Sequence, residues 1–188
     1  NCSVCFKPTD ECTCVNKYLS THYIRKLFKV YRYSYDESLP SSRLIFALKR
    51  ANRKDVIDFL SDEIVESIRR NLKNPEKCIF TNVPRRKKSI IEFGYDHAAE
   101  LSKMIAKKLS AQYYQPLYSK VKLEQKSSPG AMRLTNASFL IKHNAKSLEG
   151  KRVVVVDDVV TTGASMGAVA MLLRGRGAKQ IFGATSAV

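Results

Sequence analysis

The sequence lacks any apolar run of about 20 residues, the length that a helix needs to cross a bilayer. We therefore expect no membrane insertion. It also lacks an internal repeat and any segment that resembles a signal peptide. The chain begins at Asn1 rather than Met, so we expect further residues upstream. A chain of 188 residues with 44% hydrophobic residues can bury one α/β core and a small additional segment.

Acidic residues are scarce. Asp and Glu number 17 against 33 Lys and Arg, which gives a formal net charge of +16. Such an excess of positive charge attracts polyanions, either nucleic acid or small phosphorylated ligands. The alternative is a solubilising surface of the kind found in a Lys-rich proteome. The positive charge is spread along the chain rather than gathered in one arm, and composition leaves both interpretations open.

The stretch 152–165 combines more chemistry than any other. Its four consecutive valines, 153–156, predict a buried strand that ends in two adjacent carboxylates, Asp157 and Asp158. A Thr-Thr-Gly turn follows, and then an apolar stretch, 164–173, that predicts a helix. In an open α/β sheet, ligands bind beyond the carboxyl ends of the strands, where turn and helix N–H groups can hold phosphate. Paired carboxylates accept hydrogen bonds from vicinal hydroxyls or bind Mg²⁺. The pattern therefore indicates a site for a ribose 5-phosphate.

Residues 153–165 resemble the signature with which type I phosphoribosyltransferases bind phosphoribosyl pyrophosphate (PRPP). The alternative, an ordinary strand ended by an acidic helix cap, explains one Asp better than two. The resemblance implies a doubly wound, mainly parallel sheet and Mg²⁺ bound together with PRPP. It implies that Asp157 and Asp158 are the catalytic pair, which holds the ribose hydroxyls. The 5-phosphate would contact the seven residues that follow: Val159, Val160, Thr161, Thr162, Gly163, Ala164 and Ser165.

A basic loop follows the predicted strand Cys78–Val83 and contains Arg85 and Arg86. This loop would face the same crevice as the carboxylates if the two strands are neighbours, and Arg offers planar, bidentate geometry to phosphate oxygens. In type I phosphoribosyltransferases the equivalent loop binds pyrophosphate, so Arg85 and Arg86 are the expected contacts. The alternative is a solvated basic turn.

A polar stretch from Ser119 to Arg133 has no hydrophobic period and is long for a loop within a compact domain. We expect it to be a mobile lid, because PRPP chemistry requires that water be kept from an oxocarbenium-like ribosyl cation. The basic side chains expected to approach the phosphates are Lys120, Lys122, Lys126 and Arg133. For each of these four residues, an ordinary surface position is the alternative.

Four of the five cysteines lie within the first fourteen residues, at Cys2, Cys5, Cys12 and Cys14. The first pair has the spacing of a zinc knuckle, whereas the second pair is one residue tighter than the common spacing. A disulfide framework is the alternative, but it belongs to oxidising compartments. A PRPP site indicates the cytoplasm, where thiols stay reduced, and therefore favours Zn²⁺. The role would be structural, because four protein ligands leave no open coordination position.

The pattern of elements divides the chain into three parts. The expected boundaries are 1–17 for a zinc knuckle with four cysteine ligands, 18–50 for a connecting strand and helix segment, and 51–188 for a phosphoribosyltransferase-like domain. Apolar spacing predicts long helices over about 54–72 and 95–109, and alternation predicts a strand over 30–35. Helices that alternate with buried strands indicate an α/β fold.

The whole chain is similar to ComF-type competence proteins of bacteria, in which a cysteine-rich knuckle precedes a phosphoribosyltransferase domain. The features that carry the resemblance are Leu48-Lys49-Arg50, a Val-Pro strand end, Gly94-Tyr95-Asp96 opening a helix, and the spacing of Gln125, Arg133 and Asn136. Phe93 and His97 stand where this family usually has Arg and Gln. His97 is conceivable as a catalytic base, although a lone histidine at a helix start is more often structural or exposed.

This second resemblance implies a cytoplasmic, Mg²⁺-PRPP-binding protein linked to DNA uptake in natural transformation, with other competence proteins as partners. An active transferase would join an acceptor nitrogen to C1 of the ribose. No base-recognition motif is readable, and the sequence leaves open both the acceptor and whether turnover occurs. The alternative is a non-catalytic protein that keeps the fold and handles single-stranded DNA through its charge and nine tyrosines.

Overall fold

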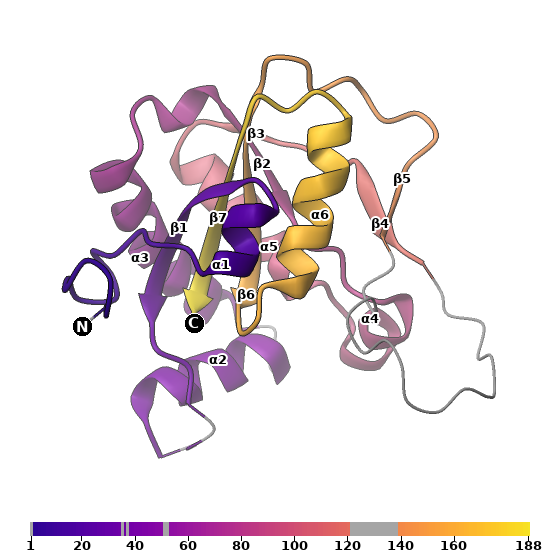
Figure 1. The fold of residues 1–188 in the computed structure, drawn as a ribbon. Coiled ribbons are helices and arrows are strands. Elements are labelled where there is room, and N and C mark those ends of the chain that lie inside the picture. Colours follow the sequence, from indigo (N-terminus) through magenta and orange to yellow (C-terminus); the bar gives the residue numbers. More distant parts are fainter. Residues whose placement is uncertain (1, 35, 37, 51–52, 121–138) are drawn as a thin grey trace, which may run out of the picture.

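The computed structural model describes residues 2–34, 36, 38–50, 53–120 and 139–188. Its centre is a five-stranded sheet in which every pair of neighbouring strands is parallel (Figure 1). The strands in spatial order are β1 (Ile24–Tyr31), β7 (Gln180–Ala187), β6 (Arg152–Val159), β2 (Cys78–Asn82) and β3 (Gln112–Tyr113). A separate antiparallel pair consists of β4 (Leu117–Ser119) and β5 (Phe139–Ile141). The predicted α/β fold with a parallel sheet is confirmed.

Helices cover both faces of the sheet. α3 (Lys54–Asn71) and α5 (His97–Lys108) pack on one face, and α6 (Ala164–Gly175) and α1 (Lys17–Thr21) pack on the other (Figure 1). α2 (Pro40–Arg50) and α4 (Lys87–Phe93) lie at the edge toward which the parallel strands run, at the bottom of Figure 1. A short 3₁₀ turn, Pro75–Lys77, leads into β2.

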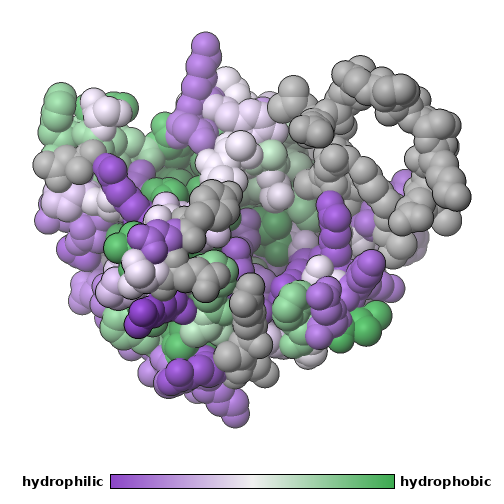
Figure 2. All heavy atoms as spheres, turned by 90° about the horizontal axis from the view of Figure 1, so that it is seen from below, coloured by the Kyte–Doolittle hydropathy of each residue, from purple (hydrophilic) through white to green (hydrophobic). Residues whose placement is uncertain are grey.

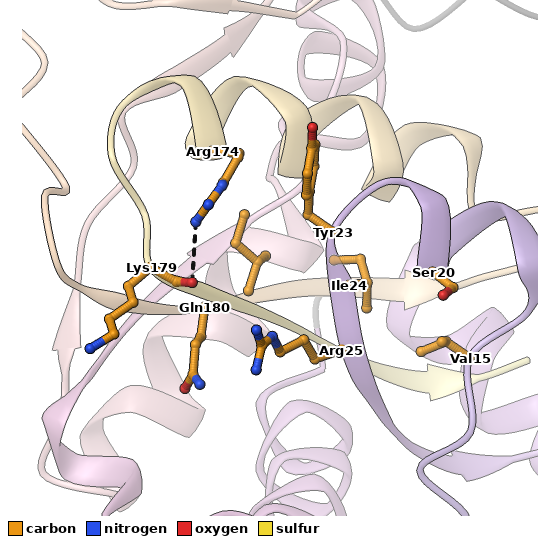
Figure 3. Close-up of a pocket in the computed structure, with 9 residues that line it drawn as sticks. Val15, Ser20, Tyr23, Ile24, Arg25, Arg174, Lys179 and Gln180 are labelled. Carbon is orange, nitrogen blue, oxygen red and sulfur yellow. Dashed lines mark hydrogen bonds between the residues drawn. The ribbon is translucent and has the colours of Figure 1, made fainter.

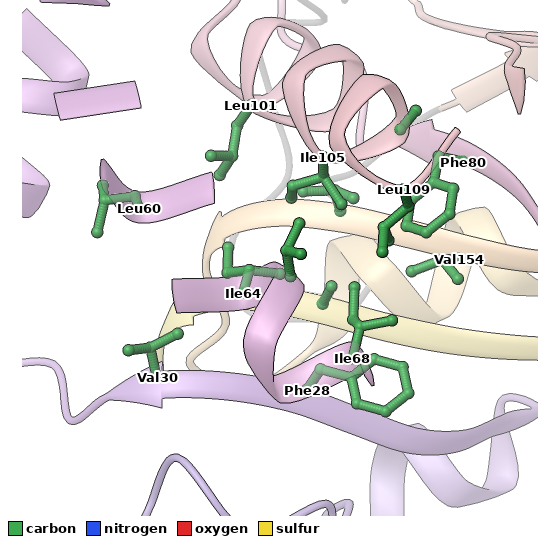
Figure 4. Close-up of a cluster of buried hydrophobic side chains, with 14 of the residues drawn as sticks. Phe28, Val30, Leu60, Ile64, Ile68, Phe80, Leu101, Ile105, Leu109 and Val154 are labelled. Atoms are coloured by element: carbon green, nitrogen blue, oxygen red, sulfur yellow. The ribbon is translucent and has the colours of Figure 1, made fainter. Parts of the chain in front are cut away.

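The larger hydrophobic cluster lies between α3, α5 and the sheet (Figure 4). Leu60, Ile64 and Ile68 recur every four residues on α3, and all three are fully buried. They face Phe80 of β2 and Val154 of β6 within the same cluster. Burying a side chain of this size contributes roughly 1.5–3 kcal/mol. The apolar spacing therefore places α3 as predicted.

Local signals set the ends of the other elements. The valines of β6 form an unbroken apolar run because helices cover both faces of the strand, and all four are fully buried. Asp96 caps α5, and its carboxylate accepts a hydrogen bond from the Ala99 N–H at 3.0 Å. α4 ends at Gly94, whose φ of 79° is the left-handed conformation that favours glycine.

The strand predicted over 30–35 is wrong in its limits, because β1 covers Ile24–Tyr31. A strand extends only as far as its partner, and the pairing with β7 ends where Tyr31 lies opposite Ala187. The lysines of β1 interrupt its apolar residues, so the sequence pattern did not indicate this strand. Lys29 is buried, and its ammonium donates a hydrogen bond to the Cys14 carbonyl at 2.8 Å.

Among the helices that the structure describes, none combines the length and the apolar composition that crossing a bilayer requires.

Candidate functional site

The strand connections single out one position at the carboxyl edge of the sheet, between β2 and β6. From β2 the chain continues through α5 to the outer strand β3, whereas from β6 it continues through α6 to β7 in the opposite direction. The two helices cover opposite faces, so the connections reverse between β2 and β6. Ligands of doubly wound sheets bind at such a switch point. Seen from this edge, the molecule is hollowed near its centre, with many hydrophilic side chains around the hollow (Figure 2).

The two neighbouring carboxyl groups at the end of β6 have different surroundings. Asp158 is buried and meets α5 and α2. Asp157 is half-buried and lines a small cavity with the turn before α6. The Asp158 N–H donates to the Asp157 carboxylate at 3.0 Å. The structure thus separates the roles that these neighbouring residues can take.

Asp158 is paired with two nitrogens. Its Oδ2 lies 3.1 Å from Nε2 of His97 at the start of α5 and 3.3 Å from Nζ of Lys49 in α2. Burial opposes ionisation of Asp158, but the hydrogen bond from His97 and the positive charge of Lys49 outweigh it and hold the pKa of this carboxyl well below its usual range. The Lys49 ammonium also lies 5.7 Å from the centre of the Tyr33 ring.

The pKa of Asp157 is shifted in the opposite direction to that of Asp158. Burial and the negative charge of Asp158 raise the pKa of the Asp157 carboxyl well above its usual range. Adjacent carboxylates that differ in this way can take different roles, one as an ionised acceptor and the other as a group that gains or loses a proton when a cation arrives.

Arg85 extends the cluster behind His97. Its Nη1 lies 2.7 Å from Nδ1 of His97 and 3.3 Å from the Tyr95 carbonyl oxygen. The guanidinium stacks 4.7 Å from the centre of the Phe93 ring. Arg85 therefore bonds inward through Nη1, whereas its neighbour Arg86 is exposed at the same edge of the sheet.

The turn after β6 surrounds a cavity of about 70 Å³, which is lined by residues 157 and 159–166. Gly163 turns the chain with a φ of 83°, and α6 begins at the next residue. The first N–H groups of a helix have no partner within the helix, and together with the helix dipole they favour an anion. Thr161 and Thr162 are exposed beside the cavity. The arrangement can hold a phosphate group.

The N-terminal segment supports this turn from behind. The Asn16 side chain caps α1 by accepting a hydrogen bond from the Leu19 N–H, and its Nδ2 donates to the Thr162 carbonyl at 3.2 Å. A Cβ added to Gly163 would lie 2.6 Å from Cγ of Leu19, so only glycine allows α1 to approach this closely. Nothing in the sequence pattern indicated this contact.

Of the expected lid residues, Lys120 is exposed directly after β4. Lys122, Lys126 and Arg133 lie outside the described residues.

The four N-terminal cysteines come together. The Sγ atoms of Cys2, Cys5, Cys12 and Cys14 all lie within 4.8 Å of one another. Hydrogen bonds from backbone N–H groups lower the pKa of Cys2 to about 6, and burial raises the pKa of Cys14. Tetrahedral zinc with Zn–S bonds of about 2.3 Å holds its sulfurs about 3.8 Å apart, which lies within this limit. The residues therefore fit a structural metal, and the 2–14 segment gathers four thiols as the spacing predicts.

A second surface lies at the opposite, amino edge of the sheet. A groove of about 540 Å³ is lined by Arg25, Arg174 and Lys179 among others (Figure 3). A neighbouring groove of about 520 Å³ shares Arg25 and is lined by five further cations: Lys26, Arg69, Arg70, Lys73 and Arg152. No acidic residue lines either groove among the described residues. We call the two together the amino-edge groove.

Most cations of the amino-edge groove bond to backbone oxygens, which leaves their charge uncompensated. Arg174 donates to the Lys179 carbonyl at 3.2 Å (Figure 3), Lys26 donates to that of Asn71 at 2.9 Å, and Arg152 to that of Lys73 at 2.9 Å. Among the residues that the structure describes, Arg70 is the groove cation with an acidic partner, at 3.9 Å from the Asp10 carboxylate. An excess of cations of this kind attracts polyanions.

Sequence reasoning did not place Lys49 or the pairing of His97 with Asp158 in the site. The apolar spacing predicted a helix over about 95–109, but not that the first residue of α5 meets the end of β6. Lys49 comes from a helix far away in the sequence, and nothing in the local sequence distinguished it from other lysines.

Comparison with known proteins found a family model that matches the C-terminal part of the chain. Residues 96–187, just under half of the chain, match the phosphoribosyl transferase domain. The matched range contains His97, both carboxylates and the phosphate turn, and it leaves out Lys49 and Arg85. This part of the chain is phosphoribosyltransferase-like. No curated protein is similar enough to count as a relative.

Several solved structures share features of the fold at low similarity. A hypoxanthine phosphoribosyltransferase from Staphylococcus aureus is 14% identical, with a TM-score of 0.44, and the alignment covers 69% of this chain and 61% of that one. A purine phosphoribosyltransferase from Pyrococcus horikoshii is 20% identical, with a TM-score of 0.43 and coverage of 69% and 70%. The Leishmania donovani hypoxanthine-guanine enzyme is 11% identical, with a TM-score of 0.41 and coverage of 77% and 67%.

Proposed function

We propose that this chain, phosphoribosyltransferase-like over residues 96–187, binds PRPP together with Mg²⁺ at the carboxyl edge of its sheet. The observation that carries the proposal is the combination of an acidic pair at the end of β6 with a phosphate-sized turn at the N-terminus of α6. A ribose 5-phosphate has hydroxyls and a phosphate at its two ends, and these two features match them in kind.

Each part of PRPP has a proposed partner. Asp157 and Asp158 would accept hydrogen bonds from the ribose 2′- and 3′-hydroxyls, and the turn of residues 159–165 would hold the 5-phosphate through N–H groups and hydroxyls. Arg86, with the N–H groups of Arg85 that do not face His97, would hold the pyrophosphate, because a guanidinium carries five N–H donors. Lys120 would approach the same end.

Mg²⁺ fits this donor set, since carboxylate and phosphate oxygens are its preferred ligands. When bound, it neutralises charge on the pyrophosphate. In a transferase step, an acceptor nitrogen would form a bond to C1 of the ribose while the bond from C1 to the pyrophosphate oxygen breaks. The pyrophosphate leaves with the bonding electron pair. The chain's own contribution would be to position the two reactants and to stabilise charge.

Calorimetric titration of PRPP, with and without Mg²⁺, tests the proposal. We expect Mg²⁺-dependent binding that is lost in the Asp157→Asn/Asp158→Asn double variant and kept in Lys107→Gln, an exposed control on α5. Ribose 5-phosphate and pyrophosphate should each compete with PRPP, because each fills one part of the site. Absence of binding by the folded wild-type protein would overturn the proposal.

The four cysteines are proposed to hold a structural Zn²⁺. The support is the mutual distance of their sulfurs, within 4.8 Å. Cys2→Ser/Cys5→Ser should lose zinc and lower the melting temperature, whereas Cys78→Ala should keep its zinc because Cys78 lies in β2, outside the cluster. Purified protein that contains no zinc, and whose melting temperature a strong chelator leaves unchanged, would contradict a structural metal.

A second candidate function is the binding of single-stranded DNA, in the setting of DNA uptake and other competence proteins that the ComF resemblance implies. The amino-edge groove supports it, because phosphate backbones are attracted to unbalanced cations. In fluorescence anisotropy, a labelled oligonucleotide should bind with steep salt dependence. Lys73→Glu/Lys179→Glu should weaken it far more than Lys54→Glu/Lys107→Glu, which changes the net charge equally outside the groove. Equal effects of the two pairs would exclude the groove.

A further inference from the structure

We propose that His97 is a positioning residue that fixes the Asp158 carboxylate for PRPP, and that Arg85 fixes the tautomer in which His97 does so. The inference rests on the proposed PRPP site and adds to it a chain of three side chains, from the loop after β2, from α5 and from β6. It also separates His97 from the role of a catalytic base.

The tautomer follows from the chemistry of Arg85. A guanidinium has donors and no acceptor, so the Nδ1 of His97, at 2.7 Å from Arg85 Nη1, must be the acceptor of that hydrogen bond. The ring proton then resides on Nε2. Nε2 lies 3.1 Å from Oδ2 of Asp158, and it therefore donates to the carboxylate.

Arg85 is itself held in place. Its Nη1 donates to the Tyr95 carbonyl, its plane lies over the Phe93 ring, and its backbone N–H donates to the Asp96 carboxylate at 3.3 Å. The same Asp96 caps the helix that begins with His97. The donor and the ring that it fixes are thus tied to one helix start, which keeps their relative position constant.

The groups around His97 leave it no free nitrogen. Arg85 occupies Nδ1, Asp158 faces Nε2, and the ring is 6% exposed, with Tyr95 edge-on at 6.2 Å between centroids. A general base needs a nitrogen that can accept a proton from the substrate. His97 acts instead through Asp158.

Two donors converge on one oxygen of Asp158. His97 reaches Oδ2 from α5, and Lys49 reaches the same atom from α2 at 3.3 Å. Hydrogen bonds to a carboxylate favour its ionised form and fix its orientation. Loss of the His97 donor would leave Lys49, on a long flexible side chain, as the partner that holds this carboxylate, and the ribose hydroxyls would meet a less ordered acceptor.

PRPP affinity in matched histidine variants provides the first test. His97→Leu should weaken PRPP binding about tenfold or more, the usual effect of losing a hydrogen bond to a charged group. His97→Gln should recover most of that loss, because its amide can donate to Asp158 and accept from Arg85. His143→Leu makes the same change at an exposed histidine and should bind as the wild type. Thermal unfolding checks that each variant folds.

Nitrogen NMR of the imidazoles provides the second test, with a readout that a purely structural histidine would not move. The chain has three histidines, so comparison with His97→Gln assigns the His97 signals. We expect a protonated Nε2 and an unprotonated Nδ1 in the wild type, and a changed tautomer balance in Arg85→Met. An Nδ1–H tautomer in the wild type would overturn the inference.

The two tests separate this inference from the function on which it rests. Wild-type protein that binds no PRPP overturns the proposed function, and with it the role of His97 in binding. Wild-type binding that His97→Leu leaves unchanged overturns the inference and leaves the function standing.

Discussion

The two edges of the sheet carry charge in opposite ways. At the carboxyl edge, Asp158 is buried and paired with Lys49 and His97, and Asp157 beside it is held in a different protonation regime. At the amino edge, partly or fully exposed cations bond to backbone carbonyls that do not neutralise them. Buried, paired charges have fixed directions and suit one small ligand. Exposed, unbalanced charges attract any polyanion and are weakened by salt.

Among these variants, Asp158→Asn should have the largest effect on stability. We expect the free energy of unfolding at pH 7 to fall by about 3 kcal/mol, because Lys49 and His97 would then face a neutral amide in a buried place. Chemical denaturation measures it. The pKa of Asp158 is lowered in the folded protein, so its contribution is present above the unfolded pKa of about 4 and is lost as the pH falls through the folded value. A variant as stable as the wild type at pH 7 would contradict the pairing.

Gly163→Ala should have the next largest effect. The added Cβ would lie 2.6 Å from the Leu19 side chain, and the φ of 83° is strained for alanine. We expect a loss of about 2 kcal/mol in stability and weaker PRPP binding, since the turn must move. Gly150→Ala is the matched control: its φ is 70°, but its Cβ would meet nothing within 4 Å. Equal losses in the two variants would show that strain alone, and not α1, limits the turn.

Asn16 variants test whether the N-terminal segment supports the turn after β6 at the carboxyl edge. Asn16→Asp keeps the cap of α1 but replaces the Nδ2 donor to the Thr162 carbonyl with an acceptor. We expect PRPP affinity to fall severalfold with only a small change in stability. Asn16→Ala also removes the cap and should cost about 1 kcal/mol in stability. Calorimetry and denaturation measure both effects. Unchanged PRPP affinity in Asn16→Asp would show that the turn needs no support from α1.

Asp157→Asn should change stability in the direction opposite to Asp158→Asn. The pKa of Asp157 is raised in the folded protein, so its contribution is present below the unfolded pKa and is lost as the pH rises through the folded value. An amide imitates the protonated form and should raise the free energy of unfolding near neutral pH by about 1 kcal/mol. Denaturation at pH 7 measures it, and destabilisation there would contradict the raised pKa.

Charge reversal in the amino-edge groove should have the smallest effect, which is measured on PRPP affinity. Lys73→Glu/Lys179→Glu changes the amino-edge groove and should leave PRPP affinity within about a factor of two, since distant surface charges are screened by salt. Calorimetry at physiological ionic strength measures it. A large loss of PRPP affinity would show that the two edges are coupled, and the comparison between them would fail.

Much of the fold followed from local pattern. The valines of β6 and the apolar spacing in α3 and α5 each involve only neighbouring residues, and the structure has these elements close to where they were expected. The gathering of the four cysteines was predicted on the same basis. β1 was misplaced because its limits depend on β7, which the local sequence does not contain.

The candidate site also combines features that the sequence determined with features that only the tertiary structure determined. The sequence alone determined which residue types end β6 and which turn follows, because both are contiguous along the chain. Only the tertiary structure decided that Lys49, His97 and Arg85 surround Asp158, that Asn16 and Leu19 support the phosphate turn, and that cations from several elements line one groove. The physical reason is that burial and pairing of charge depend on which distant segments the hydrophobic core brings together, whereas periodicity and turn chemistry act between neighbours.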